Sequence, residues 1–151
     1  MAERGFKVRA LGEIAIRTAN LEAMVAFYRD TIGLEVLAGN YSDGIVFFRI
    51  AEGFGGHTSV LALFDANAGR PELAPSDAPV AGGAGSTLHH IALSLPFEEQ
   101  DAVRAWYDSR GIVYRVQEFG WIGWRGIFTT DPDGNTVELV AYDPSMLDPA
   151  G

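Results

Sequence analysis

Three ionisable residues stand beside or within apolar segments of the sequence, and their side chains could bind a metal ion or move a proton. Glu138 interrupts the segment TVELVAY, while Glu13 and His90 directly precede IAI and IAL. A carboxylate taken out of water needs a partner to offset its lost hydration, and a cation can be that partner. Imidazole and carboxylate groups also serve as ligands of divalent metals and as acid–base groups.

The sequence leaves a structural role open for each of these residues. His90 could be a core histidine that is hydrogen-bonded to the backbone. Glu13 could instead pair with Arg17 or Arg125 in a cavity that holds no metal.

An internal repeat relates the segments that carry these residues. LGEIAI (11–16) matches LHHIAL (88–93), AMVAFY (23–28) matches AVRAWY (102–107), and GHTSVLALFDA (56–66) matches GNTVELVAYDP (134–144), each 77 to 79 positions later. The match makes Glu13 equivalent to His90, and Val60 equivalent to Glu138. We predict two homologous modules within one domain, 9–66 and 86–144, joined by a Gly-, Pro- and Ala-rich linker at 67–85.

Each module has the periodicity of a strand, a helix and three more strands. Strands are expected at 14–17, 34–38, 44–50 and 58–64, and again at 90–95, 112–117, 125–130 and 136–142. Helices are expected from Asn20, as N-cap, to Gly33 and from Pro96 to Gly111. Their apolar stripes are Leu21, Met24, Val25, Tyr28 and Ala102, Val103, Trp106, Tyr107. Asp131 to Gly134 suits a type I turn between antiparallel strands, so the order is βαβββ twice in an α+β fold.

Alternation along the strands assigns side chains to faces. Glu13, Ala15 and Arg17 should share one face, and His90, Ala92 and Ser94 should share the equivalent face. His89 should then point to the opposite side from His90, in a structural or supporting role.

Composition excludes several classes of partner and site. The chain of 151 residues has 11 Lys and Arg against 20 Asp and Glu, a net charge of −9, and no cysteine. Nucleic acid and anionic membranes are therefore unexpected partners, and disulfides, thiolate nucleophiles and Cys-based metal sites are excluded. With no long apolar segment, a cytoplasmic location is expected.

The pattern EIAIRTANLEAMVAFYRDTIGL, followed by HHIAL and DPDGNTVELV, resembles the vicinal oxygen chelate superfamily, which includes glyoxalase I, extradiol dioxygenases and bleomycin resistance proteins. The resemblance implies that the two modules form an open mixed β-barrel around a central cavity, with a divalent metal between them. It places metal ligands at Glu13, His90 and Glu138; the fourth position, Val60, has no donor atom. The family commonly has His or Gln where this chain has Glu13.

The leading hypothesis is a metal-dependent lyase, isomerase or dioxygenase that chelates two neighbouring oxygens of a small substrate. The ion could be Fe, Mn, Zn, Ni or Mg, and Glu138 or Glu13 would shuttle a proton. Arg125, Trp124 and Tyr142 are candidate substrate-binding residues, although each Trp could instead belong to the core.

His57 is a further candidate substrate-binding residue. It is a weaker candidate for a metal ligand, because alternation points it away from the face of Val60 unless a bulge intervenes. The alternative function is a metal-free protein that sequesters a small molecule, as in the bleomycin-resistance branch. A homodimer is expected.

Overall fold

The computed structural model describes residues 4–5, 8–40, 44–66 and 88–149 and divides the chain into two units, Met1–Ala78 and Pro79–Gly151. The boundary between the units falls within the predicted linker, 67–85, which lies outside the described residues.

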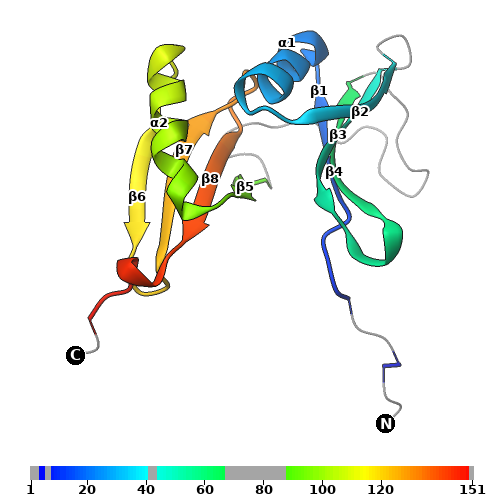
Figure 1. Cartoon of the computed structure of the whole chain (residues 1–151). Coiled ribbons are helices and arrows are strands. Elements are labelled where there is room, and N and C mark those ends of the chain that lie inside the picture. Colours follow the sequence, from blue (N-terminus) through cyan, green and yellow to red (C-terminus); the bar gives the residue numbers. More distant parts are fainter. Residues whose placement is uncertain (1–3, 6–7, 41–43, 67–87, 150–151) are drawn as a thin grey trace. The chain divides into compact units, whose positions relative to one another are not determined.

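In its described residues, the first unit contains one α-helix and one four-stranded sheet (Figure 1). Its sheet has the order β1-β4-β3-β2, in which β1 and β4 are parallel and the other pairs are antiparallel. In chain order the elements are β1 (Glu13–Thr18), α1 (Leu21–Ala26), a π-helical turn (Phe27–Thr31), β2 (Glu35–Asn40), β3 (Ile45–Glu52), a 3₁₀ turn (Phe54–Gly56) and β4 (Thr58–Asp65).

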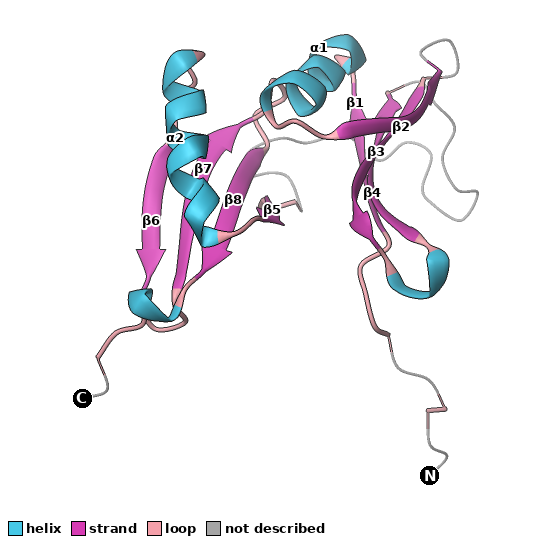
Figure 2. Ribbon diagram, viewed as in Figure 1, coloured by secondary structure: helices cyan, strands magenta, loops and turns pink. Residues whose placement is uncertain are grey.

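The second unit repeats this arrangement (Figure 2). Its sheet has the order β5-β8-β7-β6, again with one parallel pair, β5 and β8. The elements are β5 (Ile91–Ser94), a 3₁₀ turn (Phe97–Glu99), α2 (Gln100–Ser109), β6 (Arg115–Phe119), β7 (Trp124–Thr130), β8 (Thr136–Tyr142) and a 3₁₀ turn (Pro144–Met146). The predicted α+β class and the order βαβββ in each module are confirmed.

Helix α1 and the π-helical turn after it cover one face of the first sheet with the predicted apolar stripe. Leu21, Met24, Val25 and Tyr28 are all buried, as are Val46, Phe48, Leu61 and Leu63 of the strands. Gly33 ends the helical segment with a positive φ of 88°, which glycine adopts without strain. Asn20 occupies the N-cap position, but its side chain makes no capping hydrogen bond, so the predicted capping role is wrong.

Helix α2 buries only part of the predicted stripe. Tyr107 and Gln100 are fully buried, whereas Trp106 is 45% exposed and Ala102 is exposed. The Gln100 amide donates hydrogen bonds to the backbone oxygens of Arg125 (2.8 Å) and Leu139 (3.4 Å) and accepts one from Arg125 Nε (2.7 Å). A polar residue therefore takes part of the helix–sheet contact, because it satisfies backbone and side-chain groups that an apolar residue would leave unpaired.

The predicted turn before β8 is confirmed. Gly134 N donates to Asp131 O (2.9 Å), and φ at Gly134 is 84°. The buried Asp131 carboxylate accepts hydrogen bonds from the backbone amides of Asp133 and Asn135, both at 2.9 Å. This turn fixes where β8 begins, and hence which face carries residue 138.

No helix in the described part of the chain is long and apolar enough to cross a membrane.

Candidate functional site

His90 and Glu138, two of the predicted metal ligands, meet in the second unit. His90 lies just before β5 on an edge of the sheet, and Glu138 lies in the middle of the neighbouring strand β8. Their Nε2 and Oε1 atoms are 3.2 Å apart, and the side chains are 34% and 7% exposed. The sequence thus brings an imidazole and a nearly buried carboxylate into direct contact.

Gly126 on β7 makes room for this carboxylate. A Cβ atom at Gly126 would overlap Glu138 Oε2 and come within 2.7 Å of the Phe128 ring. A glycine within a strand often marks such a close approach. The site therefore depends on a missing side chain as well as on the two that are present.

Burial raises the pKa of Glu138 above its ordinary value, because a carboxylate loses hydration when it is taken from water. The charge of His90 and its hydrogen bond to the carboxylate act in the opposite direction and lower the pKa. Burial dominates, so Glu138 holds its proton more tightly than an exposed glutamate does.

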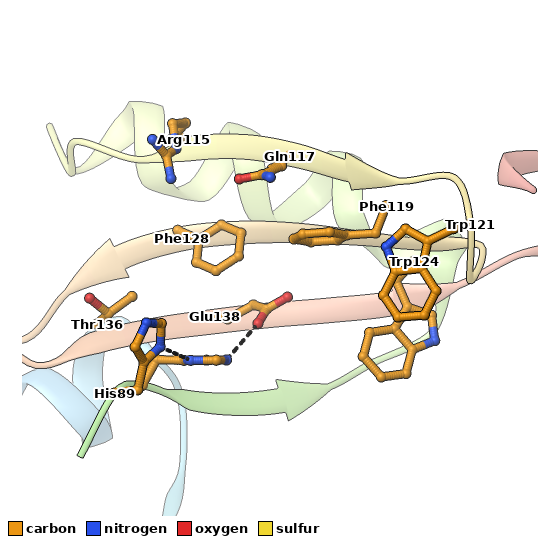
Figure 3. A pocket seen from close by; sticks show the side chains of 10 residues that line it. His89, Arg115, Gln117, Phe119, Trp121, Trp124, Phe128, Thr136 and Glu138 are labelled. Atoms are coloured by element: carbon orange, nitrogen blue, oxygen red, sulfur yellow. Dashed lines mark hydrogen bonds and ion pairs between the residues drawn. The ribbon is translucent and has the colours of Figure 1, made fainter. Parts of the chain in front are cut away.

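His89 lies on the same side as His90, so the prediction that the two point apart is wrong. Their Nδ1 atoms are 2.8 Å apart, and both rings line one hollow. The reason is local: residues 88–90 precede β5 and do not follow strand alternation. Figure 3 shows the resulting chain of polar contacts from His89 through the second imidazole to Glu138.

The hollow has a volume of about 470 Å³ and lies over the face of the second sheet that carries Glu138 (Figure 3). Besides the two histidines and Glu138, its lining combines polar and aromatic side chains: Arg115, Gln117, Thr136, Phe119, Trp121, Trp124 and Phe128. Small-molecule sites commonly have this character, with apolar walls and a few polar groups that fix orientation.

Sequence reasoning missed Arg115, Gln117 and Phe119, which share one face of β6. These residues alternate with Val116 and Glu118, and this pattern indicates one face of a strand. The predicted strand, 112–117, began too early for that face to be recognised. Backbone pairing aligns Arg115 and Phe128 with Glu138 in one row across β6, β7 and β8.

Trp124 and Trp121 line the hollow with 43% and 74% of their surfaces exposed, so the alternative that they belong to the core is wrong. Arg125 follows Trp124 on β7 and turns to the other side. Its Nε donates to Gln100 Oε1 (2.7 Å), and its guanidinium carbon is 4.6 Å from the centre of the Phe97 ring. These contacts hold Arg125 against the segment that leads into α2, away from the residues that line the hollow.

Tyr142 is exposed and pairs with Trp124 across β8 and β7. It does not line the hollow; a Cβ atom at Gly123 would lie 2.9 Å from its ring. Its role in substrate binding stays a prediction.

The other predicted site residues belong to the first unit. Glu13 begins the edge strand β1, is exposed, and pairs in register with the buried Val60 of β4. His57 is exposed just before β4, and its ring packs against Gly12, 3.2 Å from the position that a Cβ atom there would take. The sheet does contain two shifts in register, but they fall between Val36 and Ala38 of β2 and between Arg49 and Ala51 of β3. A shared site for Glu13, His90 and Glu138 stays a prediction.

Within either unit taken by itself, no three His, Asp or Glu side chains among the described residues gather to hold a metal ion. The second unit supplies one imidazole nitrogen and one carboxylate oxygen at contact distance.

Comparisons with known proteins show the family of the chain. The profile of the Glyoxalase/Bleomycin resistance protein/Dioxygenase superfamily matches residues 10–139. The chain belongs to this superfamily. No curated protein sequence matches it.

Solved structures of the glyoxalase superfamily share this fold. A lactoylglutathione lyase from Agrobacterium tumefaciens is 25% identical, with a TM-score of 0.62 over 87% of this chain and 92% of that one. A glyoxalase/dioxygenase from Nostoc punctiforme is 22% identical, with a TM-score of 0.66 over 95% and 97%. A glyoxalase/bleomycin resistance protein/dioxygenase from Nocardioides is also 22% identical, with a TM-score of 0.60 over 98% and 92%.

Proposed function

We propose that this glyoxalase-superfamily protein is a divalent-metal-dependent enzyme that acts on a small molecule with two neighbouring oxygens, through lyase or isomerase chemistry. The observation that carries the proposal is the contact between His90 Nε2 and the nearly buried Glu138 Oε1, at 3.2 Å, beside a hollow of about 470 Å³. Glu13 is the proposed third ligand.

The chemistry of this donor pair suits a cation. Glu138 is buried enough that loss of hydration raises its pKa, and a positive charge beside it would offset that cost. Two donor atoms 3.2 Å apart can both contact one ion, since metal–nitrogen and metal–oxygen bonds are about 2.0–2.2 Å long. A nitrogen and an oxygen donor do not select one metal among Fe, Mn, Zn, Ni and Mg.

When bound, a divalent ion supplies Lewis-acid polarisation of the two substrate oxygens. The carboxylate of Glu138 is the proposed base that takes a proton from the carbon next to them. Its raised pKa brings it closer to neutral pH, where a general base works best. In the metal-free protein, His90 steadies the ionised carboxylate through its hydrogen bond. With an ion bound, the same nitrogen would hold the ion.

The likeness to a lactoylglutathione lyase at 25% identity supports proton transfer over oxygen chemistry. Dioxygenase activity is the alternative for a metal-dependent enzyme. The identity of the copurifying ion tests this alternative, because iron would favour oxygen chemistry. We also propose that the protein is a homodimer and that it is located in the cytoplasm.

Metal content and metal binding test the proposal. We expect the purified full-length protein to carry, or after chelation to take up, close to one equivalent of a divalent ion. His90→Ala and Glu138→Gln should each weaken binding at least about 10-fold to 100-fold, the range seen even for residues that only support ligands. Glu118→Gln is the matched control, because Glu118 is an exposed carboxylate of β6 that does not line the hollow. Wild type that cannot be loaded with any divalent ion would exclude the metal-dependent enzyme.

A metal-free binding protein is the second candidate, and the first unit favours it. Val60 stands where the second unit has Glu138, and its side chain has no donor atom. Its register partner on β3 is Arg49, a cation. If this candidate is correct, the hollow binds its ligand with equal affinity before and after chelation.

A further inference from the structure

We propose that the hollow of the second unit takes a small carboxylic acid with a flat apolar group, and that Arg115 binds its carboxylate while Phe119 and Trp124 contact the flat group. This inference rests on the proposed function, since it names the substrate class of the same site.

Arg115 is an exposed arginine that lines the hollow. It projects from β6 among the residues that line the hollow (Figure 3). No carboxylate of the described residues pairs with it. Arg125, by contrast, is bound by Gln100 and lies 3.8 Å from a Glu118 oxygen. An unpaired guanidinium beside an apolar hollow suits a carboxylate, which it can bind through two parallel hydrogen bonds.

The charges in the hollow fix which way an acid would bind. Arg115 and Glu138 occupy the same row of the sheet with Phe128 between them. Neighbouring strands are about 4.8 Å apart, so the two backbone positions are separated by about 10 Å. Glu138 repels an anion and Arg115 attracts it, which places the carboxylate of the ligand at β6, away from β8.

The aromatic side chains supply the flat surface. Phe119 and Trp124 are register partners at the far end of β6 and β7, and Figure 3 shows Trp121 beside them. The Phe119 and Phe128 rings are 6.4 Å apart and inclined at 68°, an edge-to-face arrangement. Trp121 and Trp124 keep much of their surface exposed, and a ring of the ligand can cover it. Gln117, between Arg115 and Phe119 on the same face, can donate a further hydrogen bond to the ligand.

Binding of model acids to the metal-free full-length protein tests this inference. The probes are phenylacetate, its neutral analogue phenylacetamide, and acetate, which has no ring. Titrations in EDTA should be followed by calorimetry and by the indole N–H signals of Trp121 and Trp124 in NMR spectra. We expect phenylacetate to bind at least tenfold more tightly than either phenylacetamide or acetate.

Substitutions then assign the preference to residues. Arg115→Gln should abolish the preference for phenylacetate over phenylacetamide, while Arg104→Gln, an exposed arginine of α2, should keep it. Trp124→Ala should weaken both aromatic probes, and Trp106→Ala on α2 should weaken neither. Circular dichroism checks that each variant is folded.

Equal binding of phenylacetate and phenylacetamide, no binding of phenylacetate, or an unchanged preference in Arg115→Gln would overturn the inference. The result is separable from the metal test. A protein that selects the acid but binds no metal supports the inference while the metal-dependent function fails. A protein that binds metal through His90 and Glu138 without selecting the acid overturns the inference alone.

Discussion

The two βαβββ units share one strand order but distribute charge differently across their sheets. In the first unit, register pairing places Glu13, Val60, Arg49 and Glu35 in a row from β1 to β2. In the second, the equivalent row from β5 to β6 is Ala92, Glu138, Phe128 and Arg115. The carboxylate stands on the edge strand in one unit and on a central strand in the other.

That displacement by one strand decides how far the carboxylate is buried. Glu13 on the edge strand β1 is exposed, whereas Glu138 on β8 has strands on both sides and is nearly buried. Burial on this central strand raises the pKa of Glu138, because the carboxylate loses hydration. Two units with one strand order can therefore differ in reactivity, because an acidic residue on a central strand is buried and one on an edge strand is not.

Metal affinity gives the largest test of this difference. We expect Glu138→Gln to weaken metal binding by at least about 100-fold, since it removes a charged ligand that the fold has already dehydrated. Glu13→Gln should have a smaller effect, because an exposed edge residue is less constrained. Calorimetric titration of both variants measures the ratio. A larger loss for Glu13→Gln would reverse the ranking of the two units.

Substitution of Gly126, the glycine that makes room for the Glu138 carboxylate, should have the second-largest effect. Gly126 stands at the register position that Phe47 fills in the first unit. Because a Cβ atom would overlap Glu138 and crowd Phe128, Gly126→Ala should lower the free energy of unfolding by about 1–3 kcal/mol. Denaturant unfolding measures it. The cost should shrink in a Glu138→Ala background, and a cost that stays unchanged would mean that the carboxylate does not need this space.

The pH dependence of stability tests the burial of Glu138. Burial raises the folded-state pKa of Glu138, so between the unfolded and folded pKa values the unfolded chain binds fewer protons. Stability from this group is therefore fully present below the ordinary glutamate pKa and is lost as the pH rises through the folded pKa. In metal-free protein, Glu138→Gln should be modestly more stable than wild type at pH 7, and the advantage should disappear near pH 4. Thermal unfolding across this range measures the difference, and a destabilised variant at pH 7 would show that the pair with His90 outweighs burial.

A buried tyrosine of the second unit gives the smallest effect. Tyr107 OH has no hydrogen-bond partner among the described residues, and burial raises the pKa of this phenol to about 12. Tyr107→Phe should therefore change stability by less than about 1 kcal/mol at pH 7. Above pH 10 the unfolded chain ionises first, so wild type should lose stability that the variant keeps. Unfolding at pH 8 and pH 11 tests this, and a large loss at pH 8 would indicate a hydrogen bond to the phenol.

The repeat made the strand order predictable, because two copies of one pattern reinforce signals that are weak in a single copy. Alternation also identified the faces of β1 correctly. It could not predict the register. Glu138 pairs with Ala92, whereas the sequence match with Glu13 and Val60 would pair it with His90. The contact between His90 and Glu138 therefore runs diagonally, from a residue outside the strand.

The ends of elements accounted for the other errors in the site. The amide of Ile112 donates back to Tyr107 O (2.9 Å), so this apolar residue closes helix α2 instead of starting a strand. That shift concealed the face that carries Arg115. Arg125 could have been assigned from sequence, since its neighbour Trp124 must point to the opposite face of β7.

The buried amide of Gln100 has a mechanical consequence. It donates hydrogen bonds to the peptide oxygens of Arg125, next to Gly126, and of Leu139, next to Glu138. One side chain at the start of α2 thus couples this helix to both strands that hold the carboxylate in place. Any displacement of α2 would therefore also displace the backbone beside Gly126 and Glu138.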